Sequence, residues 1–342
     1  MKLGFFALDE NQRRRAINEA AVRRRMNPVI MEKDFWVSWM LGVLFQSSFA
    51  DALVFKGGTS LSKVFGAINR FSEDIDLSVS TELLGLTAPG NSRNQANKWM
   101  KQAEEACTAA ARDHFLPELH DIIDPVLSPM LPESGHQWLE FQIDKVTNSP
   151  VILFHYPTTQ PSGFEYLRRS VKLEFGSLTE QRPIGHHPVK PWLADEFPNL
   201  FQDWTCDVVA LEIERTFWEK ATILHAEHHR TPGKPTPDRF SRHYADTAAL
   251  ARHPDGAKAA KLPEVCQRVV DWKARFFGSS WARYDLAVPG TFRLLPAEDR
   301  VDHLRDDYQA MKDMYLTEPL SFDEVLFHLN NLELQINHRI SE

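Results

Sequence analysis

Asp74 and Asp76 stand one residue apart in the apolar segment DIDLSV (74–79). If this segment is a strand, both carboxylates project from one face while the apolar residues between them fill a core on the other. Two neighbouring carboxylates repel each other at neutral pH unless a cation lies between them or one of them is protonated. Because oxygen ligands of this kind select Mg²⁺ or Mn²⁺, the pair predicts a divalent-metal site.

Two glycines, Gly57 and Gly58, precede this acid pair. They follow the apolar run ALVF (52–55) and open the segment GGTSLSK (57–63), a pattern typical of a strand that turns into a helix. Backbone N–H groups at such a turn bind phosphate, and the hydroxyls of Thr59 and Ser60 add hydrogen-bonding groups. A phosphate site and a metal site on neighbouring strands together predict a site for a nucleoside triphosphate with its metal.

Other motifs fit these residues less well. A Walker A loop ends in Gly-Lys-Ser/Thr, which GGTSLSK lacks, and an EF-hand needs further acids and a glycine that do not follow Asp74. A metal-binding Asp-x-Asp of a glycosyltransferase remains compatible with the acid pair. A plain turn at the glycines and a turn or capping role for Asp74 are the structural alternative. We favour a ligand site, since an acid pair on one strand face costs stability without a ligand.

The composition is that of an ordinary globular protein, with 342 residues, 43% apolar and 25% charged, and the length favours two domains. No window approaches the roughly 18 consecutive apolar residues of a membrane helix, and charge interrupts the N-terminus before a secretory core could form. We therefore expect a cytoplasmic protein with no membrane contact. The three cysteines are widely spaced, which argues against disulfides or a zinc knuckle; they are Cys107, Cys206 and Cys266.

Positive charge is concentrated near the N-terminus. Residues 1–70 carry eleven Lys or Arg against six Asp or Glu, whereas the whole chain has a net charge of -8. The two triple-arginine runs, 13–15 and 23–25, put Arg14 and Arg25 about 20° apart around a helix. That face could bind RNA phosphates, although charge runs are more often solvated helix surfaces.

The hydrophobic pattern predicts an α+β chain that becomes mostly helical after about residue 190. The expected helices cover 9–25, 31–49, 97–115, 207–229, 238–252, 262–276, 297–315 and 322–340, and the expected strands cover 52–55, 74–79, 138–146, 150–156 and 169–177.

Gly-Gly followed by Asp-x-Asp on the next strand resembles the first motif of the DNA polymerase β-like nucleotidyltransferase superfamily. The wording FKGGTSLSK…RFSEDIDLSV is similar to the AbiEii/AbiGii toxin branch and the related MenT toxins of type IV toxin–antitoxin systems. Weaker blocks extend the similarity over about residues 30–250: EKDFW (32–36), RTFWEKATILH (215–225) and RHYADTAAL (242–250). The resemblance implies a nucleotidyltransferase domain of mixed sheet flanked by helices, with the N-terminal helices, over 1–190. An α-helical domain over 191–342 would contribute Lys220 and Asp246 to the active site.

The resemblance also implies a role for each matching residue. Gly57, Gly58 and Ser60 would hold the triphosphate, and Asp74 and Asp76 would hold the metal. Lys220 would neutralise phosphate charge, and Asp246 would lie close to the nucleotide. The third carboxylate would be Glu174, with Lys172 on the same strand face, or else Glu165 or Asp144. Thr59, Lys63 and Arg242 complete the expected nucleotide contacts.

The implied function is a Mg²⁺-dependent (or Mn²⁺-dependent) toxin of a type IV toxin–antitoxin or phage-defence (abortive infection) system. It would transfer NMP from an NTP to an acceptor such as the 3′ end of tRNA, with release of pyrophosphate. Its RNA acceptor would bind through the basic N-terminal region, and its cognate antitoxin would be encoded separately and need not form a stable complex. Two alternatives are an enzyme that AMPylates a protein and a nucleotide-binding regulator or antitoxin without turnover.

Two lesser signals concern the later helices. His225, His228 and His229 share a helix face, but HAEHH is not the HExxH motif of a zinc protease, so we expect satisfied or solvated histidines. A second face carries positive charge and Asp246, which favours a basic rim around the nucleotide; its members are Arg239, Arg242, His243 and Asp246.

Overall fold

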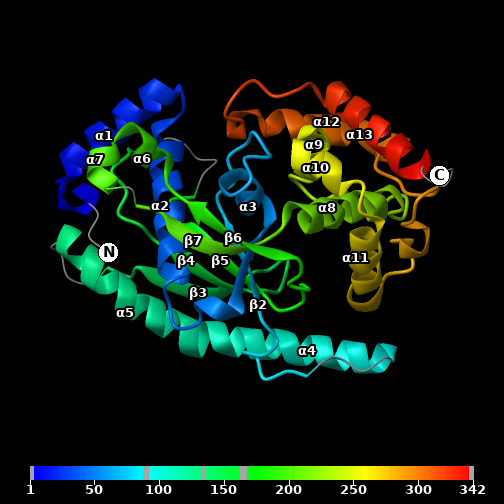
Figure 1. Cartoon of the computed structure of the whole chain (residues 1–342), viewed down its shortest axis with the longest axis horizontal. Coiled ribbons are helices and arrows are strands. Elements are labelled where there is room, and N and C mark those ends of the chain that lie inside the picture. The colour runs from blue at the N-terminus through cyan, green and yellow to red at the C-terminus, as the bar shows by residue number, and fades with distance from the viewer. Residues whose placement is uncertain (1–3, 88–91, 132–135, 162–167, 203, 339–342) are drawn as a thin grey trace. The chain divides into compact units, whose positions relative to one another are not determined.

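The computed structural model describes residues 4–87, 92–131, 136–161, 168–202 and 204–338 (Figure 1). The chain forms two compact units. The first unit comprises Met1–Val64, Glu73–Ala88 and Lys101–Ala210, and the second comprises Phe65–Ser72, Pro89–Met100 and Leu211–Glu342.

A seven-stranded mixed sheet organises the first unit, in the order β3-β4-β5-β2-β1-β7-β6. Its centre is β5, β2 and β1: β2 runs parallel to β5 and antiparallel to β1, and β1 runs parallel to β7. The strands are β1 (Leu53–Lys56), β2 (Ile75–Val79), β3 (Leu139–Ile143), β4 (Pro150–Phe154), β5 (Val171–Gly176), β6 (Ile184–Val189) and β7 (Cys206–Leu211). The sheet and its flanking helices confirm the expected α+β fold.

The helix α2 (Pro28–Leu44) is buried over nearly its whole length. Asn27 caps it by accepting a hydrogen bond from the N–H of Val29 at 2.8 Å, and Pro28 occupies the first turn, where no amide donor is needed. Its aromatic residues Trp36 and Trp39 contact the ring of Phe154 on β4. Burial of this apolar surface between helix and sheet forms the core of the first unit.

The other helices of the first unit follow from local signals. Asp9 and Gln12 form a capping box at the start of α1 (Glu10–Arg24), and Arg25 ends that helix in the left-handed conformation. The helix α3 (Gly57–Lys63) starts at the glycine pair. Helices α4 (Arg93–Ala110), whose first residues belong to the second unit, and α5 (Leu116–Leu127) join through one π turn, and α6 (Trp192–Glu196) and α7 (Pro198–Phe201) follow β6.

The second unit is helical. Its helices are α8 (Ile213–His228), α9 (Ser241–Arg252), α10 (Pro254–Ala259), α11 (Pro263–Phe276), α12 (Val301–Ala310) and α13 (Phe322–Asn337). The helix α9 is central, since α8, α10, α12 and α13 all pack against it. No helix among the described residues is long and apolar enough to cross a membrane.

Six helices and strands were not predicted from the sequence: α5, α6, α7, α10, β6 and β7. The segment IGHHPV of β6 keeps most of its side chains exposed or half-buried, so it lacks the apolar pattern of a core strand. The expected helix from residue 207 was wrong at its start, because CDVVAL forms β7 and the helix begins only at Ile213. A short apolar run that leads directly into an amphipathic helix does not show its own boundary.

Candidate active site

Asp76 is the second residue of β2, which lies between β5 and β1 in the sheet. Its register partner on antiparallel β1 is Lys56, and its partner on parallel β5 is Glu174. Residues directly opposite each other on paired strands project from the same face. The sheet therefore places the carboxylates of Asp76 and Glu174 side by side, as a metal site with a third acid would require.

Gly57 lies so close to Asp76 that no residue with a side chain fits at position 57. Its φ of +82° is in the left-handed region, and a Cβ added there would lie 2.2 Å from Oδ2 of Asp76. Any side chain at position 57 would thus displace the carboxylate as well as strain the backbone. The first glycine of the pair makes room for the acid.

Asp74 precedes β2, and its side chain is half-buried. Its backbone carbonyl accepts a hydrogen bond from the hydroxyl of Thr59, but its carboxylate has no hydrogen-bond partner among the described residues. Burial raises the pKa of Asp74 to about 6, with further contributions from the charges of Asp76 and Glu73. An unpartnered carboxylate beside a second acid is the donor set that a divalent cation would neutralise.

Lys172 is the counter-charge on the same face of β5. Its ammonium lies 2.6 Å from Oε2 of Glu174 and 2.7 Å from Oδ2 of Asp144. Desolvation opposes the charge, but these two hydrogen bonds raise the pKa of Lys172. Lys172 also stabilises the charged form of Asp74, so this lysine interacts with three acids, Asp74, Asp144 and Glu174.

The two described candidates for the third carboxylate differ in their surroundings. Oδ1 of Asp144 accepts hydrogen bonds from the backbone N–H groups of Val146 (2.8 Å) and Thr147 (3.0 Å), so Asp144 caps a turn. The hydrogen bond from Lys172 and these backbone donors hold the pKa of Asp144 well below its usual range. Glu174 instead faces Asp76, and Glu165 lies outside the described residues.

The hydroxyls of Thr59 and Ser60 are used within the protein. Both side chains are fully buried; Thr59 donates to the carbonyl of Asp74, and Ser60 donates to the carbonyl of Gly57 at 2.9 Å. Thr59 thus ties the glycine turn to the residue before β2, and Ser60 bonds within the first turn of α3. The side chain of Lys56, the N-cap residue of α3, does not cap the first turn. No side chain caps the N-terminus of α3, which begins with Gly57 and Gly58.

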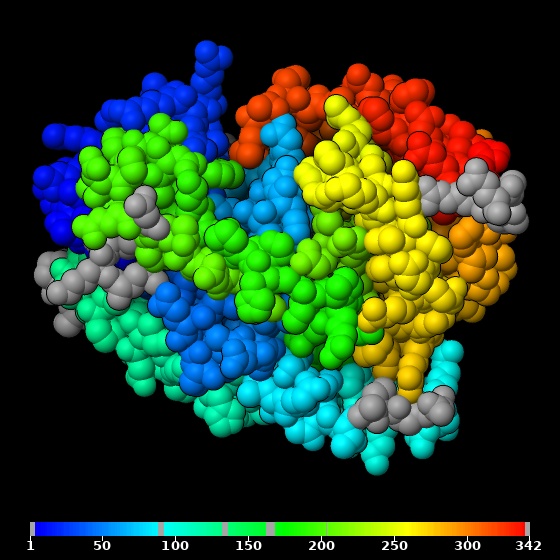
Figure 2. Space-filling model, viewed as in Figure 1, coloured from blue at the N-terminus to red at the C-terminus, as the bar shows by residue number. Residues whose placement is uncertain are grey.

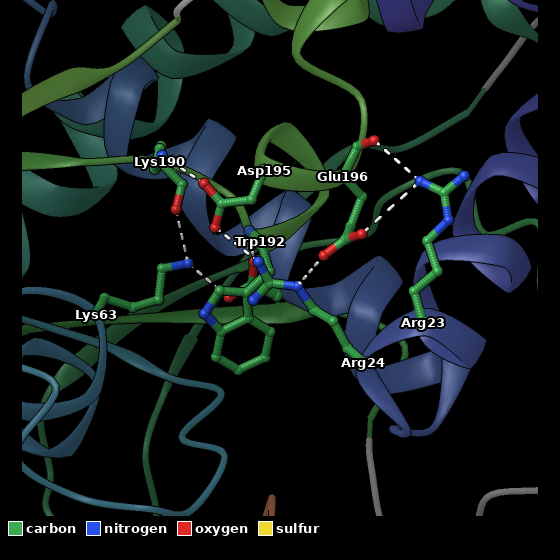
Figure 3. Close-up of polar contacts among 8 residues, drawn as sticks. Arg23, Arg24, Lys63, Lys190, Trp192, Asp195 and Glu196 are labelled. Carbon is green, nitrogen blue, oxygen red and sulfur yellow. Dashed lines mark hydrogen bonds and ion pairs between the residues drawn. The ribbon is translucent and has the colours of Figure 1, made fainter.

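Lys63 is paired within the first unit. Its ammonium lies 2.6 Å from Oδ1 of Asp34 and 3.0 Å from the carbonyl of Lys190, and 5.0 Å above the centre of the Trp192 ring (Figure 3). The other carboxylate oxygen of Asp34 accepts the N–H of Trp192 at 2.7 Å. These contacts fix α3 to α2 and to the start of α6.

The neighbours of Asp34 on α2 are also buried charges with distant partners. Glu32 accepts hydrogen bonds from the hydroxyl of Thr158 and the N–H of Thr159, both at 2.6 Å. Lys33 forms an ion pair with Glu73, the residue before Asp74, and donates to the carbonyl of Arg168 at 2.7 Å. The EKD of EKDFW therefore joins one helical turn to Lys63, Glu73, Thr158, Thr159, Arg168 and Trp192.

A second cluster of charges lies in the second unit. Arg70 binds Asp246 through two hydrogen bonds of 2.8 Å, and the Lys220 ammonium lies 2.7 Å from Oδ2 of the same carboxylate. All three side chains are buried. Burial lowers the pKa of Lys220; it also opposes ionisation of Asp246, but Arg70 and Lys220 hold the pKa of that carboxyl below its usual range.

Sequence reasoning missed Arg70. It lies in RFSED, just before the acid pair, and the segment around it pairs with the chain near residue 315: the N–H of Phe71 donates to Met314, and that of Leu316 donates to Asn69. The position of an arginine next to the acid motif was the signal available in the sequence.

On α9, Arg242 is exposed. Burial, together with the charges of Lys220 and Arg242, holds the pKa of His243 well below its usual value.

The arginines of the N-terminal runs are mostly paired. Arg24 binds Asp195 at 2.7 Å and Glu196 at 2.8 Å, and Arg23 pairs with Glu19 and Glu196 (Figure 3). Arg13 donates to the carbonyl of Leu8 at 2.7 Å. These contacts support a structural role for much of the basic region.

His225 and His228 on α8 are hydrogen-bonded, as expected for satisfied residues, whereas Nε2 of His229, just after the helix, is buried without a hydrogen-bond partner among the described residues. His225 contacts the carbonyl of Arg283 at 2.9 Å and accepts the N–H of Arg293 at 3.0 Å, and His228 contacts the carbonyl of Leu295 at 2.8 Å. Burial lowers the pKa of His225 to about 4. Among the residues that the structure describes, no three His, Cys, Asp or Glu side chains form a complete set of metal ligands.

With this geometry in place, comparison with known proteins identifies the family. Residues 39–328 match the family described as "Nucleotidyl transferase AbiEii toxin, Type IV TA system". The chain belongs to this AbiEii family. It is a nucleotidyltransferase, as the glycine pair and Asp-x-Asp indicated, and the predicted resemblance is confirmed.

Among solved structures, the chain is similar to MenT4, a nucleotidyltransferase toxin from Mycobacterium tuberculosis H37Rv, with 14% identity and a TM-score of 0.36. The comparison covers 87% of this chain and 98% of MenT4. No curated protein matches the AbiEii chain described here.

Proposed function

We propose that this protein is a Mg²⁺-dependent nucleotidyltransferase toxin that transfers NMP from an NTP to an RNA acceptor, the 3′ end of tRNA, and releases pyrophosphate. Membership of the AbiEii family supplies the reaction and the toxin class. The observation that carries the metal dependence is the carboxylate of Asp74, which has no hydrogen-bond partner among the described residues and lies beside Asp76.

Asp74 and Asp76 would hold the metal, and Glu174 would complete the ligand set. Glu174 is preferred to Asp144, because it is the register partner of Asp76 whereas Asp144 caps a turn. The bound cation would neutralise triphosphate charge and lower the pKa of an attacking hydroxyl. Lys172 would favour the charged form of Asp74, the form that binds a cation.

The backbone N–H groups at Gly57 and Gly58 would bind phosphate of the nucleotide. The AbiEii resemblance assigns Lys220 the role of neutralising phosphate charge. The only hydrogen-bond partner of its ammonium among the described residues is Asp246, which leaves two donors for phosphate oxygens. Arg70 and Lys220 both bind the carboxylate of Asp246, so this group of three side chains carries a net positive charge. Arg242 would add a further charge close to the nucleotide.

The cellular role that follows is a toxin that acts in the cytoplasm, where NTP, Mg²⁺ and tRNA are all present. A tRNA with an extra nucleotide at its 3′ end cannot be aminoacylated, so translation would stop. Such an arrest would serve phage defence by abortive infection, with a separately encoded antitoxin that restrains the toxin.

The test is incubation of purified protein with each α-labelled NTP, Mg²⁺ and total bacterial RNA, with RNA and protein products resolved separately. Two variants accompany the wild type: Asp76→Asn, and the control Asp207→Asn, which changes an exposed acid on β7 of the same sheet. Label in tRNA-sized RNA that is lost only in Asp76→Asn would support the proposal. Label on protein would indicate AMPylation instead, and NTP binding without label would indicate a regulator.

A further inference from the structure

A groove runs along one side of the first unit, between α1, the start of α2 and the segment 158–161, and its wall continues at Arg169. This α1 groove encloses about 790 Å³. Its floor is apolar, with Ala21, Val22 and Met26, and the side chain of Val22 is 78% exposed. Figure 2 shows the N-terminal residues, in blue, at the surface of the first unit. An exposed apolar floor of this kind favours contact with a flat, apolar group of a ligand.

The groove is also positively charged. Three arginines line it, Arg14, Arg25 and Arg169, against the single acid Glu10. Arg14 bonds to Glu10 at 2.5 Å and to the carbonyl of Thr159 at 2.8 Å, whereas the guanidinium groups of Arg25 and Arg169 form no hydrogen bond or ion pair within the described residues. Contacts within the protein therefore hold Arg14, whereas the guanidinium groups of Arg25 and Arg169 remain available to a ligand.

The groove wall is tied to the acid pair through α2. Glu32 holds the wall at Thr158 and Thr159, and the next residue, Lys33, binds both the carbonyl of Arg168 and the carboxylate of Glu73. Since Glu73 directly precedes Asp74, one helical turn fixes the groove and the metal-binding strand in the same rigid core. A chain bound in the groove would be held at a fixed position with respect to Asp74.

We infer that the α1 groove binds the single-stranded end of the nucleic-acid acceptor, with phosphates on Arg25 and Arg169 and a base on the apolar floor. Guanidinium groups bind phosphate in a bidentate manner, and single strands combine such contacts with stacking of bases on apolar or aromatic surface. The inference rests on the proposed function for the presence of an acceptor. An acidic peptide would satisfy the charges but would make little use of the floor.

The experiment compares the wild type with the double variant Arg25→Asn/Arg169→Gln. Asn is chosen because Arg25 has a φ of 54°, which Asn tolerates. The control is Arg15→Glu, which changes net charge by the same two units on an exposed residue of α1 that does not line the groove. Binding of a fluorescein-labelled single-stranded RNA 12-mer that ends in CCA is measured by anisotropy over a range of salt concentrations. Transfer to RNA and the KM for NTP are measured in parallel.

We expect the double variant to bind the 12-mer about 10-fold more weakly and to lower the salt slope by about 1.4, with an unchanged KM for NTP, while the control keeps wild-type binding. Equal binding by variant and wild type, equal loss in the control, or preference for an acidic peptide of the same length would overturn the inference. If the wild type binds the 12-mer through these arginines but labels no RNA with any NTP, the proposed function fails and the groove remains a nucleic-acid site.

Discussion

A Cβ on Gly57 would lie 2.2 Å from Oδ2 of Asp76, so the glycine motif and the acid motif occupy each other's space. The two motifs are far apart in the sequence, yet β1 and β2 pair in register and bring Lys56 opposite Asp76. The phosphate-binding role proposed for Gly57 and the metal-binding role proposed for Asp76 would therefore both depend on this close approach. Substitutions at either position should affect both.

Gly57→Ala should reduce nucleotidyl transfer at least about 100-fold, because the methyl group displaces the Asp76 carboxylate. The control is Gly66→Ala, since Gly66 also has a positive φ (+60°) but its added Cβ meets nothing within 4 Å. Both variants should lose about 1–2 kcal/mol of stability from backbone strain, measured by chemical denaturation. Similar activity in the two variants would show that the contact with Asp76 does not matter.

Asp74→Asn should make the protein more stable and inactive. The pKa of Asp74 is raised to about 6, chiefly by burial and by Asp76, whereas a carboxyl of the unfolded chain titrates near 4. The folded state then binds more protons between about pH 4 and 6, so wild-type stability falls as pH rises through about 6.

At pH 7.5 without metal, we expect the Asp74→Asn variant to gain roughly 1–3 kcal/mol in free energy of unfolding. Added Mg²⁺ should narrow the difference, because it stabilises only the wild type. Denaturation curves at pH 5 and 7.5 measure both effects. A variant that is less stable than the wild type at pH 7.5 would contradict the assignment of a strained carboxylate pair.

Glu174→Gln and Asp144→Asn should separate the two described candidates for the third carboxylate. Glu174 faces Asp76 across β5 and β2, so its amide should lower kcat about 100-fold or more and weaken binding of Mn²⁺. Asp144→Asn keeps the Oδ1 acceptor of the turn but removes the Oδ2 acceptor of Lys172, and should cost about 1–2 kcal/mol of stability while kcat stays within about 10-fold of wild type. The reverse ranking in kcat would transfer the metal role to Asp144.

The sequence identified the acid pair, the glycines and the α+β class because these signals are local. Strand periodicity placed Asp74 and Asp76 on one face. The predicted start of the first helix at residue 9 agrees with the capping box at Asp9, whereas α2 begins at Pro28 and not at residue 31. Contacts between segments that lie far apart in the sequence could not be predicted from it. Nothing in the sequence pairs Lys33 with Glu73, because a buried charge is recognised only when its partner is known.

The same reason explains why the role of Arg70 was not predicted and why Lys63, which was expected to contact the nucleotide, is paired within the protein. Both are cations near the glycine and acid motifs, and sequence alone treats such cations alike. The structure binds Lys63 to Asp34 on α2 and Arg70 to Asp246 on α9. Strand β7 was missed for another reason, since its apolar run continues into the pattern of α8.

Asp246→Asn and Lys220→Met should both abolish transfer but differ in their effect on stability. Asp246→Asn leaves the buried cations Arg70 and Lys220 without a counter-charge, which should cost roughly 3–5 kcal/mol. Lys220→Met leaves Asp246 bound to Arg70 through both oxygens and should cost only about 1–3 kcal/mol. Urea denaturation of the full chain measures which variant loses more free energy of unfolding. Equal losses of stability would mean that Arg70 does not hold Asp246 independently of Lys220.

Lys33→Met should destabilise the protein more than its double variant with Glu73→Gln. The single change leaves Glu73 largely buried with no cation in contact, which should cost roughly 3–5 kcal/mol, whereas the double variant removes both charges and should recover about 1–3 kcal/mol. Transfer should fall in the single and double variants alike, because Glu73 precedes Asp74 and Lys33 fixes that position. Free energies of unfolding for the wild type, the two single variants and the double variant give the coupling energy. Strictly additive losses would show that the ion pair does not hold the acid motif, and the rigid link from α2 to Asp74 would have to be abandoned.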